Sequence, residues 1–233
     1  MNESLQTAYG AAAAGSAIDQ RQRVLRNTYW LLALSLLPTI AGAWLGVSAG
    51  FNWFSANPFI GFVIFMGVAF GFFYAIEKFK NSGIGVALLL GFTFFMGLML
   101  SRMIGAVLGN YSNGSELIMT AFGGTALVFF GMATLASTIK RDISGMGKWL
   151  MVGVMLLIVA SVANIWLQLP ALVLTVSVLA VGIFSALMLY DIKRVIDGGE
   201  TNYVSATLAI YLDVYNVFVN LLSILGIFGG ERD

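Results

Sequence analysis

Apolar residues occur in seven long stretches that are separated by short polar segments. Each stretch is close to the ~20 residues that a helix needs to cross the ~30 Å hydrocarbon core of a bilayer. The predicted spans are residues 28–47, 58–76, 83–101, 117–137, 149–168, 171–190 and 207–228. Little more than Leu169 and Pro170 separates the fifth span from the sixth, which predicts a tight hairpin rather than one long broken helix. The pattern therefore predicts an all-α membrane protein with seven transmembrane helices.

The positive charges predict how these helices are oriented. Ten Lys and Arg residues lie on one side of the predicted spans, and two lie on the other. They are Arg21, Arg23, Arg26, Lys78, Lys80, Lys140, Arg141, Lys148, Lys193 and Arg194, against Arg102 and Arg232. Loops rich in Lys and Arg stay in the cytoplasm, so we expect a cytoplasmic amino terminus and a carboxyl terminus outside.

The same pattern predicts three segments. Residues 1–27 form a cytoplasmic tail that we expect to be disordered, because Ala8 to Ala17 is rich in Ala and Gly and has no hydrophobic periodicity. Residues 28–228 form the transmembrane domain, and residues 229–233 form a short C-terminal tail.

Composition narrows the function. Charged residues make up 10% of the chain, far below the ~25% of soluble domains, which supports a membrane protein. The chain has no histidine and no cysteine, which excludes Ser–His and thiol catalysis and removes the usual zinc ligands. The net charge of +1 gives no reason to expect nucleic acid as a partner. We therefore expect no enzymatic activity and no cofactor, and any pH sensing must come from carboxyl groups.

Asp213 is the main candidate functional residue, because an ionised side chain inside a span costs ~2.5–3.5 kcal/mol. It shares one face of the predicted last helix with Asn216, Asn220 and Ser223. A polar stripe of this kind should face protein or water, so we expect the last helix to lie at the centre of the bundle. Asp191 closes the preceding span on the same side. The two acids are predicted to form a pH-sensing site, or a cation path with transient calcium binding, in which the carboxyl groups share one proton.

Other interpretations of the two acids stay open. Asp191 could be an interfacial carboxylate at a helix end beside Lys193 and Arg194. Asp213 could make a purely structural hydrogen bond to an Asn or a Tyr. Two aspartates on adjacent helices are also typical of intramembrane aspartyl proteases. That class is disfavoured, because Asp213 lacks a Gly-x-Gly-Asp context and the Pro-Ala-Leu tripeptide at Pro170 stands in the wrong order.

Small and polar residues within the spans predict close helix packing. Pairs of glycines four residues apart let helix backbones approach, here within one chain rather than at a dimer face. These glycines are Gly67, Gly71, Gly105 and Gly109. Asn164 and Gln168 are interpreted as hydrogen-bonding residues between helices.

Several segments resemble the Bax-inhibitor-1/YccA family, and its bacterial YccA branch in particular. The matching segments are residues 24–29 (VLRNTY), 123–130 (GGTALVFF), 162–172 (VANIWLQLPAL), 198–203 (GGETNY) and 223–226 (SILG). They occur in order from residue 24 to the end of the chain, and only the N-terminal tail is unmatched.

This resemblance implies a seven-helix fold whose last helix is wrapped by the others, in a bacterial inner membrane. It implies a modulator and substrate of the membrane AAA protease FtsH, engaged through the N-terminal tail. In calcium-leak members, an aspartate pair like Asp191 and Asp213 forms a pH-sensitive latch, so the alternative function is a calcium leak. Those members also carry an arginine on the second helix, and the span 58–76 has none.

Overall fold

The computed structural model describes the backbone of residues 2–51 and 58–229 and the side chains of residues 19–51 and 59–229. Of the predicted C-terminal tail, only Gly229 falls within these ranges. Residues 230–233, including Arg232, lie outside them.

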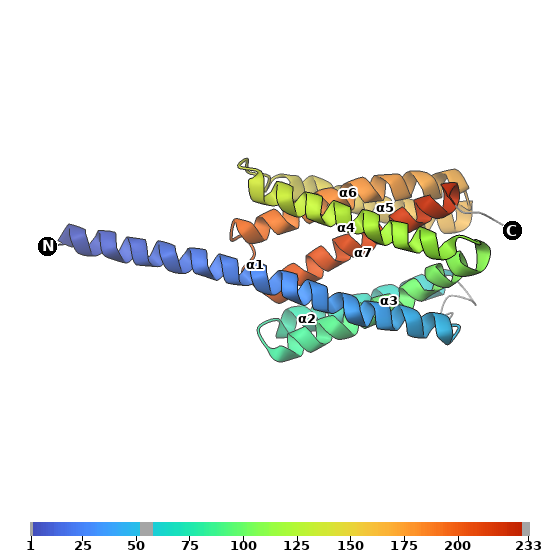
Figure 1. Ribbon diagram of the computed structural model, residues 1–233, viewed down its shortest axis with the longest axis horizontal. Helices are drawn as coiled ribbons and strands as arrows, with labels where there is room; N and C mark the ends of the chain where they lie inside the picture. The colour runs from blue at the N-terminus through green and yellow to red at the C-terminus, as the bar shows by residue number, and fades with distance from the viewer. Residues whose placement is uncertain (1, 52–57, 230–233) are drawn as a thin grey trace.

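Seven α-helices and no β-strand are found in the described residues (Figure 1). They are α1 (Asn2–Ser48), α2 (Pro58–Phe79), α3 (Gly83–Asn110), α4 (Gly114–Thr138), α5 (Met146–Leu167), α6 (Pro170–Ile196) and α7 (Tyr203–Phe228). Each is long and apolar enough to cross a membrane. The predicted all-α class and the number of spans are therefore confirmed.

Three helices extend well past the ends that hydropathy predicts. α3 continues to Asn110, α6 continues to Ile196, and α7 begins at Tyr203. Hydropathy falls where polar side chains begin, but a helix continues until its backbone hydrogen bonding is interrupted. For α6, that interruption is the turn at Gly198, whose φ of +81° lies in the region that glycine adopts at no steric cost.

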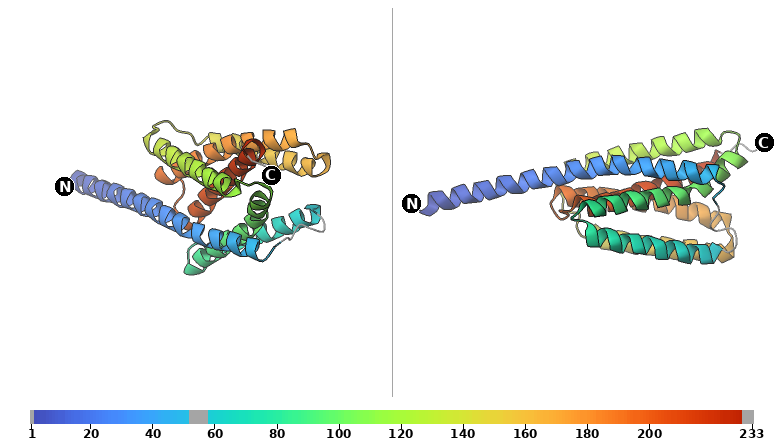
Figure 2. Two further views of the ribbon diagram at one scale, coloured as in Figure 1. Left: turned by 45° about the vertical axis from the view of Figure 1, so that its right-hand side comes forward. Right: turned by 90° about the horizontal axis from the view of Figure 1, so that it is seen from below.

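α1 is a single helix from Asn2 to Ser48, and its first half extends beyond the other helices (Figure 2). The Ala-rich composition of this half suits a helix, since alanine has the highest helix propensity. The helix passes through residue 27 without interruption. The boundary between tail and transmembrane domain is therefore not marked by a break in the backbone, and it stays a prediction.

The close contact between helices is made by α1 and α3. A Cβ atom added to Gly97 of α3 would overlap the backbone oxygen of Thr39, and one added to Gly42 of α1 would overlap that of Phe94. In contrast, a Cβ added to Gly67 or Gly71 would meet no atom of the described chain within 4 Å.

The same is true of the other predicted glycine pair, Gly105 and Gly109, within the described residues. The prediction that these two GxxxG pairs pack helices within the chain was therefore wrong. Spacing shows that a helix has a small-residue face, but the rotation of the helix decides what that face meets.

α7 packs against α1, α2, α3, α4 and α6. Its tyrosine face is anchored in the core between α1 and α3. The Tyr211 hydroxyl lies 2.8 Å from Thr39 Oγ1, which also donates to the Thr93 carbonyl at 3.1 Å. One turn further on, the Tyr215 hydroxyl donates to the Met96 carbonyl at 3.3 Å. These bonds fix the rotation of α7 and direct its opposite, polar face toward α6.

The predicted hairpin between α5 and α6 is present, and both Asn164 and Gln168 take part in its turn. Gln168 ends α5 in the left-handed conformation, with φ 49°, and Asn164 Oδ1 accepts a hydrogen bond from the Leu169 N–H at 2.9 Å. Asn164 thus satisfies a backbone donor of the turn, in place of the predicted bond between helices.

Candidate functional site

Asp213 is buried in the middle of α7, with 4% of its surface exposed. It lies ten residues from Tyr203, which is ~15 Å along the helix axis. Asp191 is half-buried on α6, five residues before that helix ends at Ile196. The two carboxyl groups lie close enough to act on each other directly. The structure thus brings the two predicted site residues together, deeper in their helices than the sequence suggests.

One oxygen of the pair has no partner. Asp213 Oδ2 is buried and accepts no hydrogen bond from the described residues. Buried polar atoms of this kind are rare in folded proteins and require a specific explanation. A purely structural hydrogen bond from an Asn or Tyr does not supply it, because Asp191 is the polar side chain in contact with Asp213.

The rest of the predicted polar stripe bonds elsewhere. The Asn216 side-chain amide donates to the Leu212 carbonyl, and that of Asn220 donates to the Asn216 carbonyl, each at 2.8 Å along α7. The Ser223 hydroxyl accepts from Ser177 of α6 at 3.3 Å. The three residues of the stripe are half-buried, and Ser223 is the one that forms a hydrogen bond with α6 among the described residues.

The cations near the acid pair are engaged with other carboxylates. Arg194, one turn beyond Asp191 on α6, acts on Asp191 through its charge but forms an ion pair with Glu200 at 3.4 Å. Lys193 pairs with Asp197 at 2.7 Å. Arg194 is therefore a positive group whose charge acts on Asp191 from the same helix.

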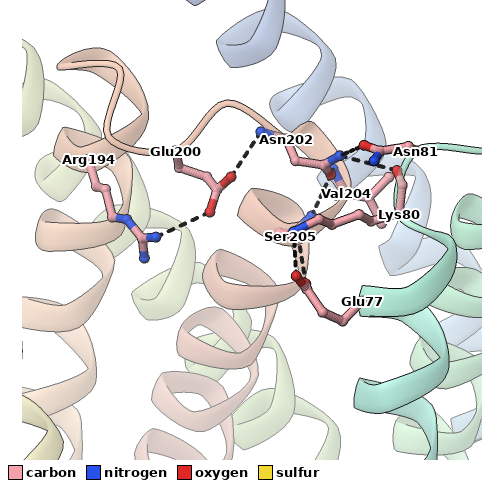
Figure 3. Close-up of polar contacts among 8 residues, drawn as sticks. All are labelled: Glu77, Lys80, Asn81, Arg194, Glu200, Asn202, Val204 and Ser205. Carbon is pink, nitrogen blue, oxygen red and sulfur yellow. Dashed lines mark hydrogen bonds and ion pairs between the residues drawn. The ribbon is translucent and has the colours of Figure 1, made fainter.

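A cluster of polar contacts closes the same end of the bundle (Figure 3). Asn202 caps α7, because its Oδ1 accepts from the N–H groups of Val204 and Ser205. Its amide group donates to the Lys80 carbonyl at 3.2 Å and to Asn81 Oδ1 at 2.8 Å. The loop between α2 and α3 is thereby tied to the first turn of α7.

Glu77 completes this cluster by joining α2 to α7. It forms an ion pair with Lys80 and accepts a hydrogen bond from the Ser205 hydroxyl at 3.2 Å. This cluster was not predicted from the sequence. An Asn directly before an apolar helical run is a known N-cap signal and marks Asn202, but nothing in the sequence indicates its contact with Lys80 and Asn81, more than 100 residues away.

The chemistry available to the acid pair is the holding of a proton or the weak binding of a cation. Two ionised carboxylates only accept hydrogen bonds, so a bond between them requires one proton. The described residues contain no group of three or more acidic or histidine side chains that could hold a metal ion. Calcium takes six to eight oxygen ligands, so two carboxyl groups suit passage of the ion better than tight binding.

Comparison with known proteins identifies a family and several relatives of this chain. A family model described as "Inhibitor of apoptosis-promoting Bax1" matches residues 21–230. The protein "Modulator of FtsH protease YccA" of Escherichia coli is 38% identical over 206 residues, which is 88% of this chain and 90% of that protein.

Two further relatives match slightly more of the chain. An uncharacterized protein of Neisseria meningitidis is 38% identical, covering 91% of this chain and 93% of its own length. One of Pseudomonas aeruginosa is 37% identical, covering 93% of this chain and 96% of its own length.

Proposed function

The chain belongs to the family of the inhibitor of apoptosis-promoting Bax1, and on that premise we propose that it modulates an FtsH-type protease of the bacterial inner membrane. The observation that carries the proposal is the 38% identity, over 88% of the chain, to a protein named as a modulator of FtsH. The role is that of a regulator and substrate of the protease rather than of an enzyme. It fits a chain that combines seven apolar helices with a long N-terminal extension.

In this proposal the N-terminal extension is the part that the protease engages. The amino terminus lies in the cytoplasm and the carboxyl terminus outside, as the ten cationic side chains on one side of the spans predict. α7 is the central helix of the bundle, a position supported by its contacts with five other helices. The ribbon of the first half of α1 extends away from the other helices in Figure 1, and this extension is the segment that the protease would engage.

The test is removal of residues 2–18 in cells that contain the protease. The truncated protein should persist longer than the full chain, and it should no longer slow the degradation of a second membrane substrate. The matched control removes residues 230–233 at the other end of the chain and should behave like the full protein. Unchanged turnover and unchanged inhibition in the N-terminal truncation would contradict the proposal.

A second candidate function is a pH-sensitive calcium leak gated by Asp191 and Asp213. The observation that favours it is the buried Asp213 Oδ2 atom, which has no partner in the described chain. A shared proton would hold α6 and α7 together at this point. Loss of that proton would place two like charges in a low-dielectric site, where their repulsion favours separation of the helices and offers oxygen ligands to a cation.

Calcium flux into proteoliposomes between about pH 6 and pH 8 tests this second function. The wild-type protein should conduct more at the higher pH, and Asp213→Asn should remove the pH dependence, because an amide does not titrate in this range. Asp142→Asn is the matched control, since Asp142 is an exposed carboxylate outside the site. Equal pH dependence in wild type and Asp213→Asn would refute the role of the acid pair.

A further inference from the structure

A groove runs along the outer surface of α5, where that helix packs against α6. It has a cavity volume of about 610 Å³, and its apolar wall includes Met151, Met155 and Val159. These residues recur every three to four positions, so they lie on one face of α5. Tyr190 of α6 and Lys148 of α5 lie at one end.

The length of the groove matches one leaflet of a bilayer. From Gly147 to Val159 the helix rises ~18 Å, at 1.5 Å per residue. Half of a ~30 Å hydrocarbon core is ~15 Å. The apolar wall is therefore long enough to accommodate one acyl chain from the headgroup level to about the bilayer midplane.

The polar end of the groove has the features of a headgroup site. Lys148 is exposed and forms no ion pair with a carboxylate of the described residues. It lies in the first turn of α5, at the positive end of the helix dipole, where a cation is unfavourable unless an anion lies nearby. Gly145 supplies no side-chain cap to the N–H groups of that turn. Trp149, 78% exposed, is typical of the membrane–water interface.

Tyr190 closes the Lys148 end of the groove because the residue of α5 beside it, Gly147, has no side chain. A Cβ atom added to Gly147 would lie 2.6 Å from Tyr190 Cζ and 2.7 Å from its hydroxyl oxygen. The tyrosine ring therefore lies directly on the α5 backbone, and its hydroxyl sits at the level of Lys148. A phosphate at this point would meet an ammonium group, a hydroxyl donor and an uncapped helix start.

We propose that this groove binds an anionic phospholipid of the leaflet on the Lys148 side. Its phosphate contacts Lys148 and Tyr190, and one acyl chain follows Met151, Met155 and Val159. The charge of the surroundings is complementary, because the adjacent loop carries Lys140 and Arg141, and Asp142 is the one acid between Arg141 and Lys148. Lys193 of α6 acts on Asp142 and reduces its repulsion of an anion. Basic pockets between transmembrane helices on the cytoplasmic side are known to select anionic headgroups.

The experiment measures lipid retention by the purified full chain with native mass spectrometry, after exchange into mixed micelles of phosphatidylglycerol and phosphatidylcholine. The wild-type protein should retain phosphatidylglycerol in preference to phosphatidylcholine. Lys148→Gln should reduce that retention at least fivefold. Lys140→Gln removes the same charge outside the groove and should reduce it less than twofold.

A second pair of variants tests the acyl-chain part of the site. Met155→Trp fills the groove and should lower phosphatidylglycerol retention, whereas Leu127→Trp places the same side chain on the exposed surface of α4 and should not. Equal retention of both lipids by the wild type would overturn the proposal. Retention of phosphatidylglycerol by Lys148→Gln at the level of the wild-type protein would also overturn it. A third contrary result would be that inorganic phosphate raises the thermal stability of the protein as much as phosphatidylglycerol does.

Discussion

The carboxyl groups of Asp191 on α6 and Asp213 on α7 lie close enough to act on each other directly, and Asp213 Oδ2 has no hydrogen-bond partner in the described chain. Two acids therefore meet where two long apolar helices pack together. Because ionised carboxylates cannot donate, the contact is favourable only while the pair holds a proton. In the proposed proton-holding state, the folded protein keeps a proton that an ordinary carboxyl group of the unfolded chain loses at about pH 4.

The acid pair predicts that stability decreases as the pH rises. Stability falls with pH wherever the folded state binds more protons than the unfolded state. The midpoint of thermal unfolding in detergent should fall for the wild-type protein as the pH rises above about 4, where carboxyl groups of the unfolded chain lose their protons. Asp213→Asn should flatten this dependence, because its amide donates to Asp191 without a shared proton. Parallel curves for the two proteins would show that the pair holds no proton.

The contact between α1 and α3 predicts opposite effects of the same substitution at two glycines. Gly97→Ala places a methyl group against the Thr39 backbone, which cannot move away as a side chain could, so it should destabilise by about 1–3 kcal/mol. Gly67→Ala meets no atom of the described chain within 4 Å and should stabilise by up to about 1 kcal/mol through helix propensity. Denaturant titration of both variants checks the signs. A loss at Gly67 as large as that at Gly97 would contradict the packing.

Asn202 is predicted to have two separable roles. Asn202→Ala removes the cap of α7, which costs about 1 kcal/mol, and also the bonds to Lys80 and Asn81. Asn202→Asp keeps the acceptor that caps the helix but loses the amide donor. Hydrogen exchange should accelerate in both the α2–α3 loop and the first turn of α7 for the Ala variant. For the Asp variant it should accelerate in the loop alone, and equal acceleration of the helix would argue against separate roles.

The loop between α4 and α5 predicts a small acid-sensitive contribution. The backbone N–H of Ser144 donates to Asp142 at 2.8 Å, which holds the Asp142 pKa below its ordinary value of 3.8. A carboxyl group with a lowered folded-state pKa stabilises above its unfolded pKa, and this contribution is lost as the pH falls through the folded value. Asp142→Ala should therefore lower the unfolding midpoint at about pH 6 but not at about pH 2.5. A difference that persists at the lower pH would point to lost packing instead.

Local properties of the chain were sufficient to predict the spans and to single out the acids. Hydropathy over twenty residues reports the solvent that a helix prefers, so the seven spans followed directly. The free-energy cost of placing a carboxyl group in such a span also depends on the segment alone, and Asp213 was identified for this reason.

Contacts between helices could not be predicted in the same way. The GxxxG spacing at Gly67 and Gly71 predicted a packing face, yet Gly42 and Gly97 make the close approach. Asn164 was expected to form a hydrogen bond between helices, but it accepts one from the Leu169 N–H in the turn after α5. Both depend on how each helix is rotated about its axis, and that rotation is fixed by distant partners such as Thr39 and Tyr211.

The sequence by itself therefore determined which segments enter the membrane and which residues are costly there, because those are properties of each segment in its solvent. The tertiary structure alone decided that Asp191 meets Asp213, that Asn202 ties two loops together, and that Lys148 opens onto an apolar groove. Each of these requires side chains from separate helices at one depth and facing one another, which only the packing of the whole bundle establishes.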